Sequence, residues 1–199
     1  MEIARHELSP WIGDALIVVD VQRDFLPGGA LGVPRGDEVI PVLNQYLDLF
    51  TRRGLPVFAT RDWHPPGHCS FQAQGGPWPP HCIAGSPGAE FPPGLALPAN
   101  ARVLSKAMAP SPDAYSGFAG TDFALVLHEA GVRRIFVGGL ATDYCVLNTV
   151  KDARALGFTT VLLEDAIRAV DVHPGDGARA IEQMRRWGAL PATLQEMTA

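Results

Sequence analysis

Short apolar runs rich in β-branched residues recur along the chain, separated by longer segments with a helical period. The runs predict strands at residues 16–20, 56–60, 102–105, 134–138 and 160–163. They are compact and mostly apolar, as strands covered on both faces are. Strands that alternate with helices are typical of a parallel sheet with helices on its faces. The pattern therefore predicts a three-layer α/β/α fold with a mostly parallel central sheet, and we expect a further short strand at 192–194.

Four segments between these runs have helical periodicity and end at a glycine. They predict helices at residues 37–53, 121–130, 143–156 and 176–187, which Gly54, Gly131, Gly157 and Gly188 follow. Each begins with threonine or aspartate, which favours helix initiation, and the glycine favours termination. In the first segment Ile40, Leu43 and Leu47 share one face. No internal repeat or change of composition divides the chain, so we expect residues 1–199 to form one domain.

A turn-rich segment interrupts this alternation. Residues 65–98 hold nine prolines and six glycines, which disfavour long helices and central strands. The same segment carries Phe71, Trp78 and two His-Cys pairs, residues that are unusual in a disordered linker. We therefore expect a long, ordered loop excursion inserted into the domain. Long loops of this kind are usually functional.

Composition narrows the class of protein. The 199 residues are 47% hydrophobic and 19% charged, which is typical of a globular protein and of neither a disordered chain nor a coiled coil. The apolar runs are too short to span a bilayer, so we expect no membrane association. A net charge of -5 without basic clusters disfavours a nucleic-acid partner. The N-terminus has no apolar signal core and the cysteines number three, so we expect a reducing cytoplasm.

Reactive side chains follow most of the predicted strands. Asp20 ends the first, Asp62 and His64 follow the second, Lys106 follows the third, and the turn at 138–145 follows the fourth. The carboxyl ends of parallel strands meet at one edge of the sheet, where open α/β sheets bind their ligands. We therefore expect these side chains to converge on one site.

Cys145 is the candidate nucleophile. With Thr142 as N-cap, it would occupy the first turn of its helix, where free N–H groups and the helix dipole favour a thiolate and could bind an oxyanion. Asp20 ends a hydrophobic strand, so its pKa should be raised and it could accept a proton from the thiol. Lys106 could hold the Asp20 charge and favour the thiolate. The alternatives are a small buried cysteine, a capping aspartate and a solvated surface lysine.

Asp62, His64 and His81 offer one carboxylate and two imidazoles, a set suited to a divalent transition metal. Three protein ligands would leave positions open for water or substrate. The alternative is a closed structural zinc site that staples the Pro-rich loop. Its candidate ligands are His64, His68, Cys69, His81 and Cys82. Outside that alternative, Cys69 and Cys82 are interpreted as structural or incidental.

Two aromatic residues lie near these positions. Phe25 and Trp78 could enclose a flat ring, although aromatic residues there are more often core or loop anchors. The G-x-G-x-x-G spacing is absent at both glycine pairs, so no nucleotide cofactor is expected.

With these residues assembled, the sequence resembles the nicotinamidases (pyrazinamidases) of the isochorismatase-like cysteine hydrolase superfamily. The resemblance runs from about residue 15 to 166. It is carried by residues 17–25 (IVVDVQRDF), 60–65 (TRDWHP), 76–82 (GPWPPHC), 105–106 (SK), 115–118 (YSGF) and 139–146 (GLATDYCV). The metal-bearing nicotinamidase branch has the elements around Asp62 and His81, whereas the wider superfamily shares only the aspartate, lysine and cysteine motifs.

The resemblance implies hydrolysis of nicotinamide to nicotinate and ammonia in NAD salvage, with pyrazinamide as a second substrate. Asp20 would accept the Cys145 proton, Lys106 would position Asp20, and a thioester would form on the cysteine. The N–H groups of Ala141 and Cys145 would hold the oxyanion, and the Leu140–Ala141 peptide would be cis.

The resemblance also assigns the ligand-binding residues. A metal on Asp62, His64 and His81 would orient the pyridine ring, which Phe25, Trp78 and Tyr115 would line. Zinc is the metal we expect, with iron or manganese as alternatives. Some relatives carry a histidine ligand where this chain has Ser70, which leaves the coordination number open. The sequence leaves both a monomer and a homo-oligomer open.

The sequence leaves two other functions open. One is an amidohydrolase of the same superfamily acting on another small amide or ureido acid, against which the metal motif argues. The other is a metal-stapled binding protein with no turnover.

Overall fold

A computed structural model describes residues 8–198. Its centre is a six-stranded sheet in the order β3-β2-β1-β4-β5-β6, with every pairing parallel. The strands are β1 Asp14–Val19, β2 Val57–Asp62, β3 Arg102–Lys106, β4 Arg134–Leu140, β5 Thr159–Arg168 and β6 Leu190–Ala192. The predicted α/β/α fold with a parallel sheet is confirmed.

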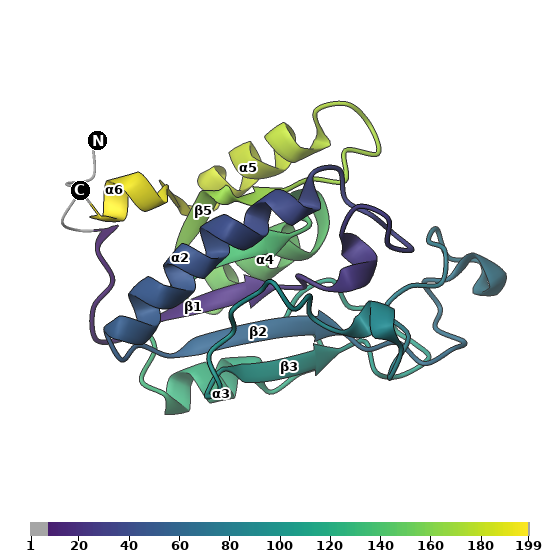
Figure 1. Ribbon diagram of the computed structural model, residues 1–199, viewed down its shortest axis with the longest axis horizontal. Helices are drawn as coiled ribbons and strands as arrows, with labels where there is room; N and C mark the ends of the chain where they lie inside the picture. The colour runs from purple at the N-terminus through teal and green to yellow at the C-terminus, as the bar shows by residue number, and fades with distance from the viewer. Residues whose placement is uncertain (1–7, 199) are drawn as a thin grey trace.

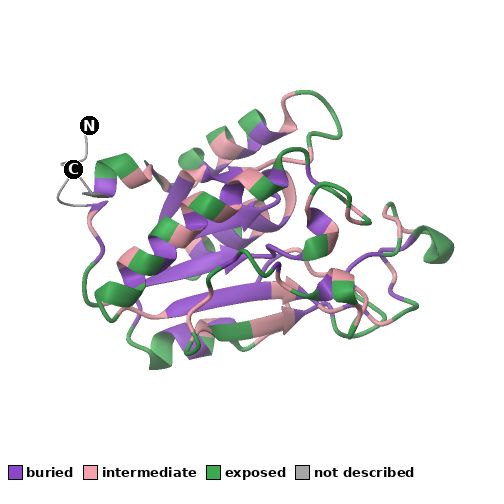
Figure 2. Ribbon diagram, viewed as in Figure 1, coloured by how far each residue is buried: buried purple, intermediate pink, exposed green. Residues whose placement is uncertain are grey.

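Helices cover both faces of this sheet (Figure 1). They are α2 Val39–Arg52, α3 Phe123–Glu129, α4 Leu147–Ala155, α5 Asp176–Arg186 and α6 Leu194–Thr198. Helices α2 and α6 contribute to one cluster of buried apolar side chains, and α3, α4 and α5 to the other. Figure 2 shows β1 and most of β2 buried among helices with exposed outer faces, while the edge strand β3 is partly exposed. Along β1 successive side chains enter alternate clusters, Leu16 on the α2 side and Ile17 on the other. This alternation explains why the run is apolar throughout.

Two strands differ in extent from the prediction. Strand β5 runs to Arg168, five residues beyond the predicted end, because Glu164 and Asp165 interrupt the apolar run without ending the pairing. Its register with β4 shifts between Val137 and Gly139. The short last strand exists but lies at Leu190–Ala192, because residues from Leu194 onward form α6.

Residues 63–101, between β2 and β3, contain only the short 3-10 helices η3 (Gln72–Gln74) and η4 (Pro87–Ala89). Backbone bridges join His64 to Ile83 and Phe71 to Trp78. The segment also bonds to η1, a 3-10 helix at Arg23–Phe25, because the Asp24 carboxylate accepts the N–H of Cys82 at 2.7 Å. These contacts hold the segment over the carboxyl end of the sheet.

The described helices are all too short or too polar to cross a membrane. Strand β1 lies between β2 and β4, so the chain moves outward from it in both directions. Side-chain-lined crevices form at such switch points, outside the carboxyl ends of the strands.

Candidate active site

Four strands deliver the predicted reactive residues to this crevice. Asp20 directly follows β1, Asp62 and Lys106 end β2 and β3, and Cys145 lies just after β4. Their exposed fractions are 0% for Asp20, 4% for Asp62, 2% for Lys106 and 6% for Cys145. The predicted convergence is therefore observed, in a site shielded from solvent.

Lys106 is the centre of this group. Its Nζ lies 3.0 Å from Asp20 Oδ2 and 3.7 Å from Cys145 Sγ, and it donates to Asp62 Oδ1 and, at 3.0 Å, to the Ala114 carbonyl. Burial acts to lower the pKa of Lys106, but Asp20 and Asp62 hold it well above its ordinary value. Lys106 is therefore a buried cation that joins the reactive group to Asp62, a contact the sequence did not reveal.

Asp20 has the environment expected of a proton acceptor. Its backbone adopts a φ of 47°, which turns the chain sharply as β1 ends. Its Oδ1 accepts a 2.7 Å hydrogen bond from Thr60. Burial raises the pKa of Asp20, while Lys106 acts in the opposite direction. A carboxylate with a raised pKa is better matched to the proton of a thiol than a solvated one.

The helix that carries Cys145 begins differently from the prediction. Residues Thr142–Val146 form a single π-helical turn, η5, before α4 begins at Leu147. Thr142 is the first residue of that turn and is buried, so it is not the N-cap, and no side chain caps the turn. The N–H groups of Tyr144 and Val146 both donate to the Ala141 carbonyl. The wider turn places Cys145 over the end of β1; π turns are frequent at functional sites.

The approach to η5 is sterically tight. The peptide between Leu140 and Ala141 is cis, as the resemblance implied. Gly139, just before it, has a φ of 126°, and a Cβ at this position would lie 2.1 Å from the Val19 carbonyl oxygen. Only glycine fits there. Strands β1 and β4 therefore meet closely where one delivers Asp20 and the other delivers Cys145.

The charges in this group act on the thiol. Burial raises the pKa of Cys145, Lys106 lowers it, and Asp20 and Asp62 raise it again, with the result well above the ordinary value. Two carboxylates and one ammonium sum to -1, so a thiolate would add a second uncompensated charge in a buried site. Lys106 therefore acts in the expected direction, toward the thiolate, but burial and the two carboxylates oppose it and together raise the pKa of Cys145. Attack by the sulfur then requires a base that takes the thiol proton.

The three predicted metal ligands lie together. One ligand atom each from Asp62, His64 and His81 falls within a group whose members are no more than 4.8 Å apart. The Nδ1 atoms of the two imidazoles point to backbone carbonyls, His64 to Ala107 at 3.3 Å and His81 to Pro79 at 2.8 Å. Such contacts orient a metal-binding histidine and leave Nε2 free for the ion.

The remaining donors fit a cation as well. Lys106 occupies Oδ1 of Asp62, whereas Oδ2 lies 3.7 Å from His64 Nε2. Burial, and then His81 and His68, lower the pKa of His64 to about 3, so its ring is neutral and can act as a ligand. The donor set therefore fits a divalent ion, whose positive charge would oppose the net negative charge beside Cys145.

The closed zinc site is not formed. Among residues 8–198, no group of neighbouring metal-ligand atoms combines the loop cysteines with the loop histidines. The His68 ring stacks on His64 at 4.1 Å, and its Nδ1 lies 2.7 Å from Ser70 Oγ. Ser70 is thus buried near the metal ligands and bonded to His68. Phe71, which the sequence indicated only as a sign of order in the loop, lies with its ring centroid 5.5 to 5.8 Å from those of His64, His68 and His81.

A small pocket is lined by Cys145 and by two of the metal ligands, Asp62 and His81. All four predicted substrate-binding residues line it: Phe25, Trp78, Tyr115 and Ala141. The Trp78 indole N–H donates to Tyr115 Oη at 3.0 Å, and Tyr144 packs edge-on against Trp78 with a centroid distance of 5.1 Å. These walls suit a flat aromatic ligand.

Sequence reasoning missed four residues of the pocket wall, Leu31, Val33, Tyr144 and Val170. The sequence could have indicated Tyr144, because it is aromatic and directly precedes Cys145. The other three are ordinary aliphatic residues from two loops, and no local pattern distinguishes them from core residues.

A doubly wound α/β sheet with a buried cysteine, aspartate and lysine at its switch point has the arrangement of an α/β cysteine hydrolase. The isochorismatase domain family matches residues 14–196, and the chain belongs to that family. The nicotinamidase of Escherichia coli (strain K12) is 38% identical over 203 residues, covering 92% of this chain and 95% of that protein.

Solved structures agree with this assignment. The pyrazinamidase of Pyrococcus horikoshii in complex with zinc superposes with a TM-score of 0.88 at 49% identity, over 92% of this chain and 99% of that one. PnC1 from L. infantum in complex with nicotinate superposes with a TM-score of 0.86 at 38% identity, over 94% and 96% of the two chains.

Proposed function

We propose that this protein hydrolyses nicotinamide to nicotinate and ammonia through a thioester on Cys145, and accepts pyrazinamide by the same route. The observation that carries the proposal is that one aromatic-walled pocket is lined both by Cys145 and by two of the three candidate metal ligands, Asp62 and His81. A general cysteine hydrolase needs the first of these features only. The names of the E. coli and P. horikoshii relatives support this substrate class.

The chemistry follows from the residues. Asp20 takes the Cys145 proton as sulfur bonds to the amide carbon, and the N–H groups of Ala141 and Cys145 stabilise the oxyanion. The C–N bond then breaks, and the proton on Asp20 passes to the leaving nitrogen to release ammonia. Water attacks the thioester, giving its proton to Asp20, and the C–S bond breaks to release nicotinate. Asp20 finally returns that proton to the sulfur.

Lys106 and the pocket walls have supporting roles. Lys106 forms ion pairs with Asp20 and Asp62 and donates to the Ala114 carbonyl. It thereby fixes the carboxylate beside Cys145 and limits the charge that builds up there. Phe25, Trp78 and Tyr115 would position the ring. A divalent ion on the Asp62 group, when bound, would supply a Lewis acid for the pyridine nitrogen. We propose zinc, in keeping with the zinc complex of the P. horikoshii structure.

We also propose that residues 1–199 form one domain, which the family match over 14–196 supports. The protein would act in the cytoplasm, where reducing conditions keep a catalytic thiol free.

The first test is ammonia release from nicotinamide by the purified protein. We expect activity to fall after treatment with a chelator and to return with zinc, manganese or iron. Folded protein that releases no ammonia under any of these conditions would refute the proposal and favour a different amide, a ureido acid or a role without turnover.

A variant test addresses the nucleophile. We expect Cys145→Ala to lose essentially all turnover while its fold and metal content persist. Cys69→Ala is the matched control, since Cys69 lies in the loop and should leave turnover unchanged. Normal turnover by Cys145→Ala would exclude the thioester mechanism.

A second variant addresses the metal. His81→Ala should lower metal stoichiometry and raise KM for nicotinamide together, since one residue serves both. His128→Ala changes an exposed histidine and is the control. Full metal content in His81→Ala would show that His81 is not a ligand.

A further inference from the structure

The two edges of the sheet differ. Strand β6 is three residues long and carries Pro191, which has no N–H to offer a neighbouring strand. Strand β3, at the other edge, is five residues long with no proline, and Arg102 and Val103 are exposed. The carbonyl of Lys106 accepts the N–H of Trp63 on the β2 side. By strand alternation, Val103 and Ser105 direct their backbone groups to the free edge.

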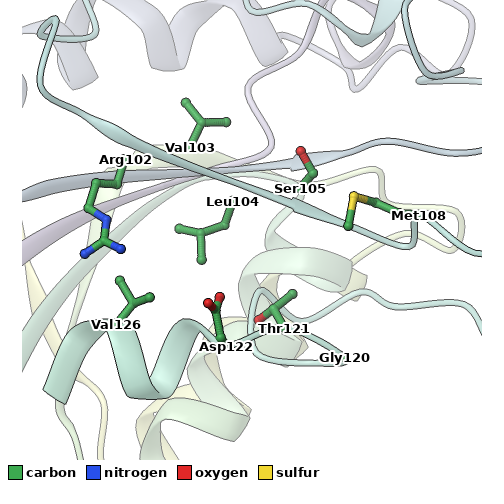
Figure 3. Close-up of a pocket in the computed structure, with 9 residues that line it drawn as sticks. All are labelled: Arg102, Val103, Leu104, Ser105, Met108, Gly120, Thr121, Asp122 and Val126. Carbon is green, nitrogen blue, oxygen red and sulfur yellow. The ribbon is translucent and has the colours of Figure 1, made fainter. Parts of the chain in front are cut away.

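A groove runs between β3 and α3 (Figure 3). In that view Arg102 and Leu104 point toward α3, with Asp122 and Val126 facing them, and Val103 points to the opposite side. Apolar side chains are exposed along this edge, with fractions of 44% for Val103 and 61% for Met108. An open strand edge with exposed apolar residues is where another strand adds.

The charges at this edge match each other across a twofold axis. Arg102 and Asp122 are both exposed, and neither forms an ion pair within residues 8–198. An antiparallel copy of β3 with Leu104 on the axis sets Val103 opposite the partner's Ser105, so that outward backbone groups face each other. Arg102 then lies level with residue 106 of the partner, on the face where the partner's α3 begins. That position brings Arg102 toward the partner's Asp122.

We propose that a second copy of this chain docks on β3, pairing the two edge strands antiparallel about a twofold axis through Leu104, with Arg102 of each copy bonded to the partner's Asp122. The interface joins the two sheets into one of twelve strands, from six in each copy. Isologous contacts of this kind are the commonest in homodimers. The surface is separate from the pocket that holds Cys145, so the proposal does not depend on the proposed hydrolysis.

Charge reversal and mixing test the proposal. Light scattering and analytical ultracentrifugation of the wild-type protein should give a dimer. In a dimer of Arg102→Glu, two carboxylates would face each other at each of the two contacts between residues 102 and 122. In a dimer of Asp122→Arg, two guanidinium groups would do so. Each variant alone should therefore raise the dimer dissociation constant at least about tenfold. Mixing the two variants restores both attractive pairs, so a heterodimer should form with nearly wild-type affinity.

One control and one further variant complete the test. Arg52→Glu reverses an exposed charge on α2 and should leave the dimer intact. Val103→Pro removes an outward N–H without touching the bonds to β2 and should weaken the dimer. A wild-type monomer at all concentrations would overturn the proposal. So would a dimer indifferent to both reversals, and so would failure of the mixed variants to associate, because a foreign partner or another face predicts no such rescue.

Discussion

Lys106 is the residue whose removal the structure predicts most sharply. It is 2% exposed and lies between the carboxylates of Asp20 and Asp62. Lys106→Met keeps an apolar stem and deletes the charge, leaving two buried carboxylates uncompensated. At the 3.0 Å separation from Asp20, the lost attraction is about 5.5 kcal/mol for an effective dielectric constant of about 20. Breaking a buried ion pair typically costs about 3–5 kcal/mol. We expect Lys106→Met to lower the free energy of unfolding of chelator-treated protein by about 3–5 kcal/mol.

The loss should depend on pH in a defined direction. Without Lys106, which acts to lower it, the pKa of Asp20 in the folded protein rises further above its unfolded value of 3.8. A group with a raised folded pKa leaves stability intact below the unfolded pKa and reduces it as pH rises through the folded pKa. The deficit of Lys106→Met relative to wild type should therefore be larger near pH 7.5 than near about pH 4.5.

Urea unfolding followed by tryptophan fluorescence measures both quantities. Lys151→Met is the matched control, because Lys151 is the one other lysine in the sequence and is exposed on α4. It should change stability by less than about 0.5 kcal/mol. A deficit for Lys106→Met below about 1 kcal/mol at neutral pH, or one that does not change with pH, would refute the charge argument.

Two further substitutions test the packing of the site. Gly139→Ala sets a Cβ against the Val19 carbonyl, so calorimetry should show a destabilisation above about 3 kcal/mol. Gly157→Ala, also at a positive φ but with open space around the added Cβ, should cost about 1 kcal/mol, and equal losses would contradict the clash. Trp78→Phe removes the hydrogen bond to Tyr115, so steady-state kinetics should show KM raised by about 2- to 10-fold. Tyr115→Phe should match it, and the double variant should be no worse than either; additive effects would show that the two act separately.

The reactive residues could be predicted because each follows a recognisable apolar run. Asp20, Lys106 and Cys145 needed only the rule that parallel strands end at one edge of a sheet. Their contacts needed three dimensions. Lys106 can bond to Asp62 because β2 and β3 are aligned with these two residues opposite each other. Neither segment's sequence alone determines this register.

Local geometry was harder to predict than position. A π-helical turn and an ordinary helical start at Thr142 share the same residue types, so the sequence favoured the commoner structure. The pocket walls Leu31, Val33 and Val170 come from loops whose course is set by tertiary contacts. Strand β5 extends beyond its apolar pattern because, after a register shift, Ile167 and Arg168 pair with β4 again.

The switch point between β1 and β4 divides the site as well as the sheet. Strands β1, β2 and β3 are contiguous in space and come from the first part of the chain, which supplies Asp20, the metal ligands and Lys106. Strands β4, β5 and β6 come from the second part, which supplies Ala141 and Cys145. A chain divided at the exposed residues 108–112 would give two fragments, each with three neighbouring strands and neither with both nucleophile and base. Turnover recovered on mixing the two fragments would show that they had associated. This architecture is therefore suited to a split-enzyme reporter of association.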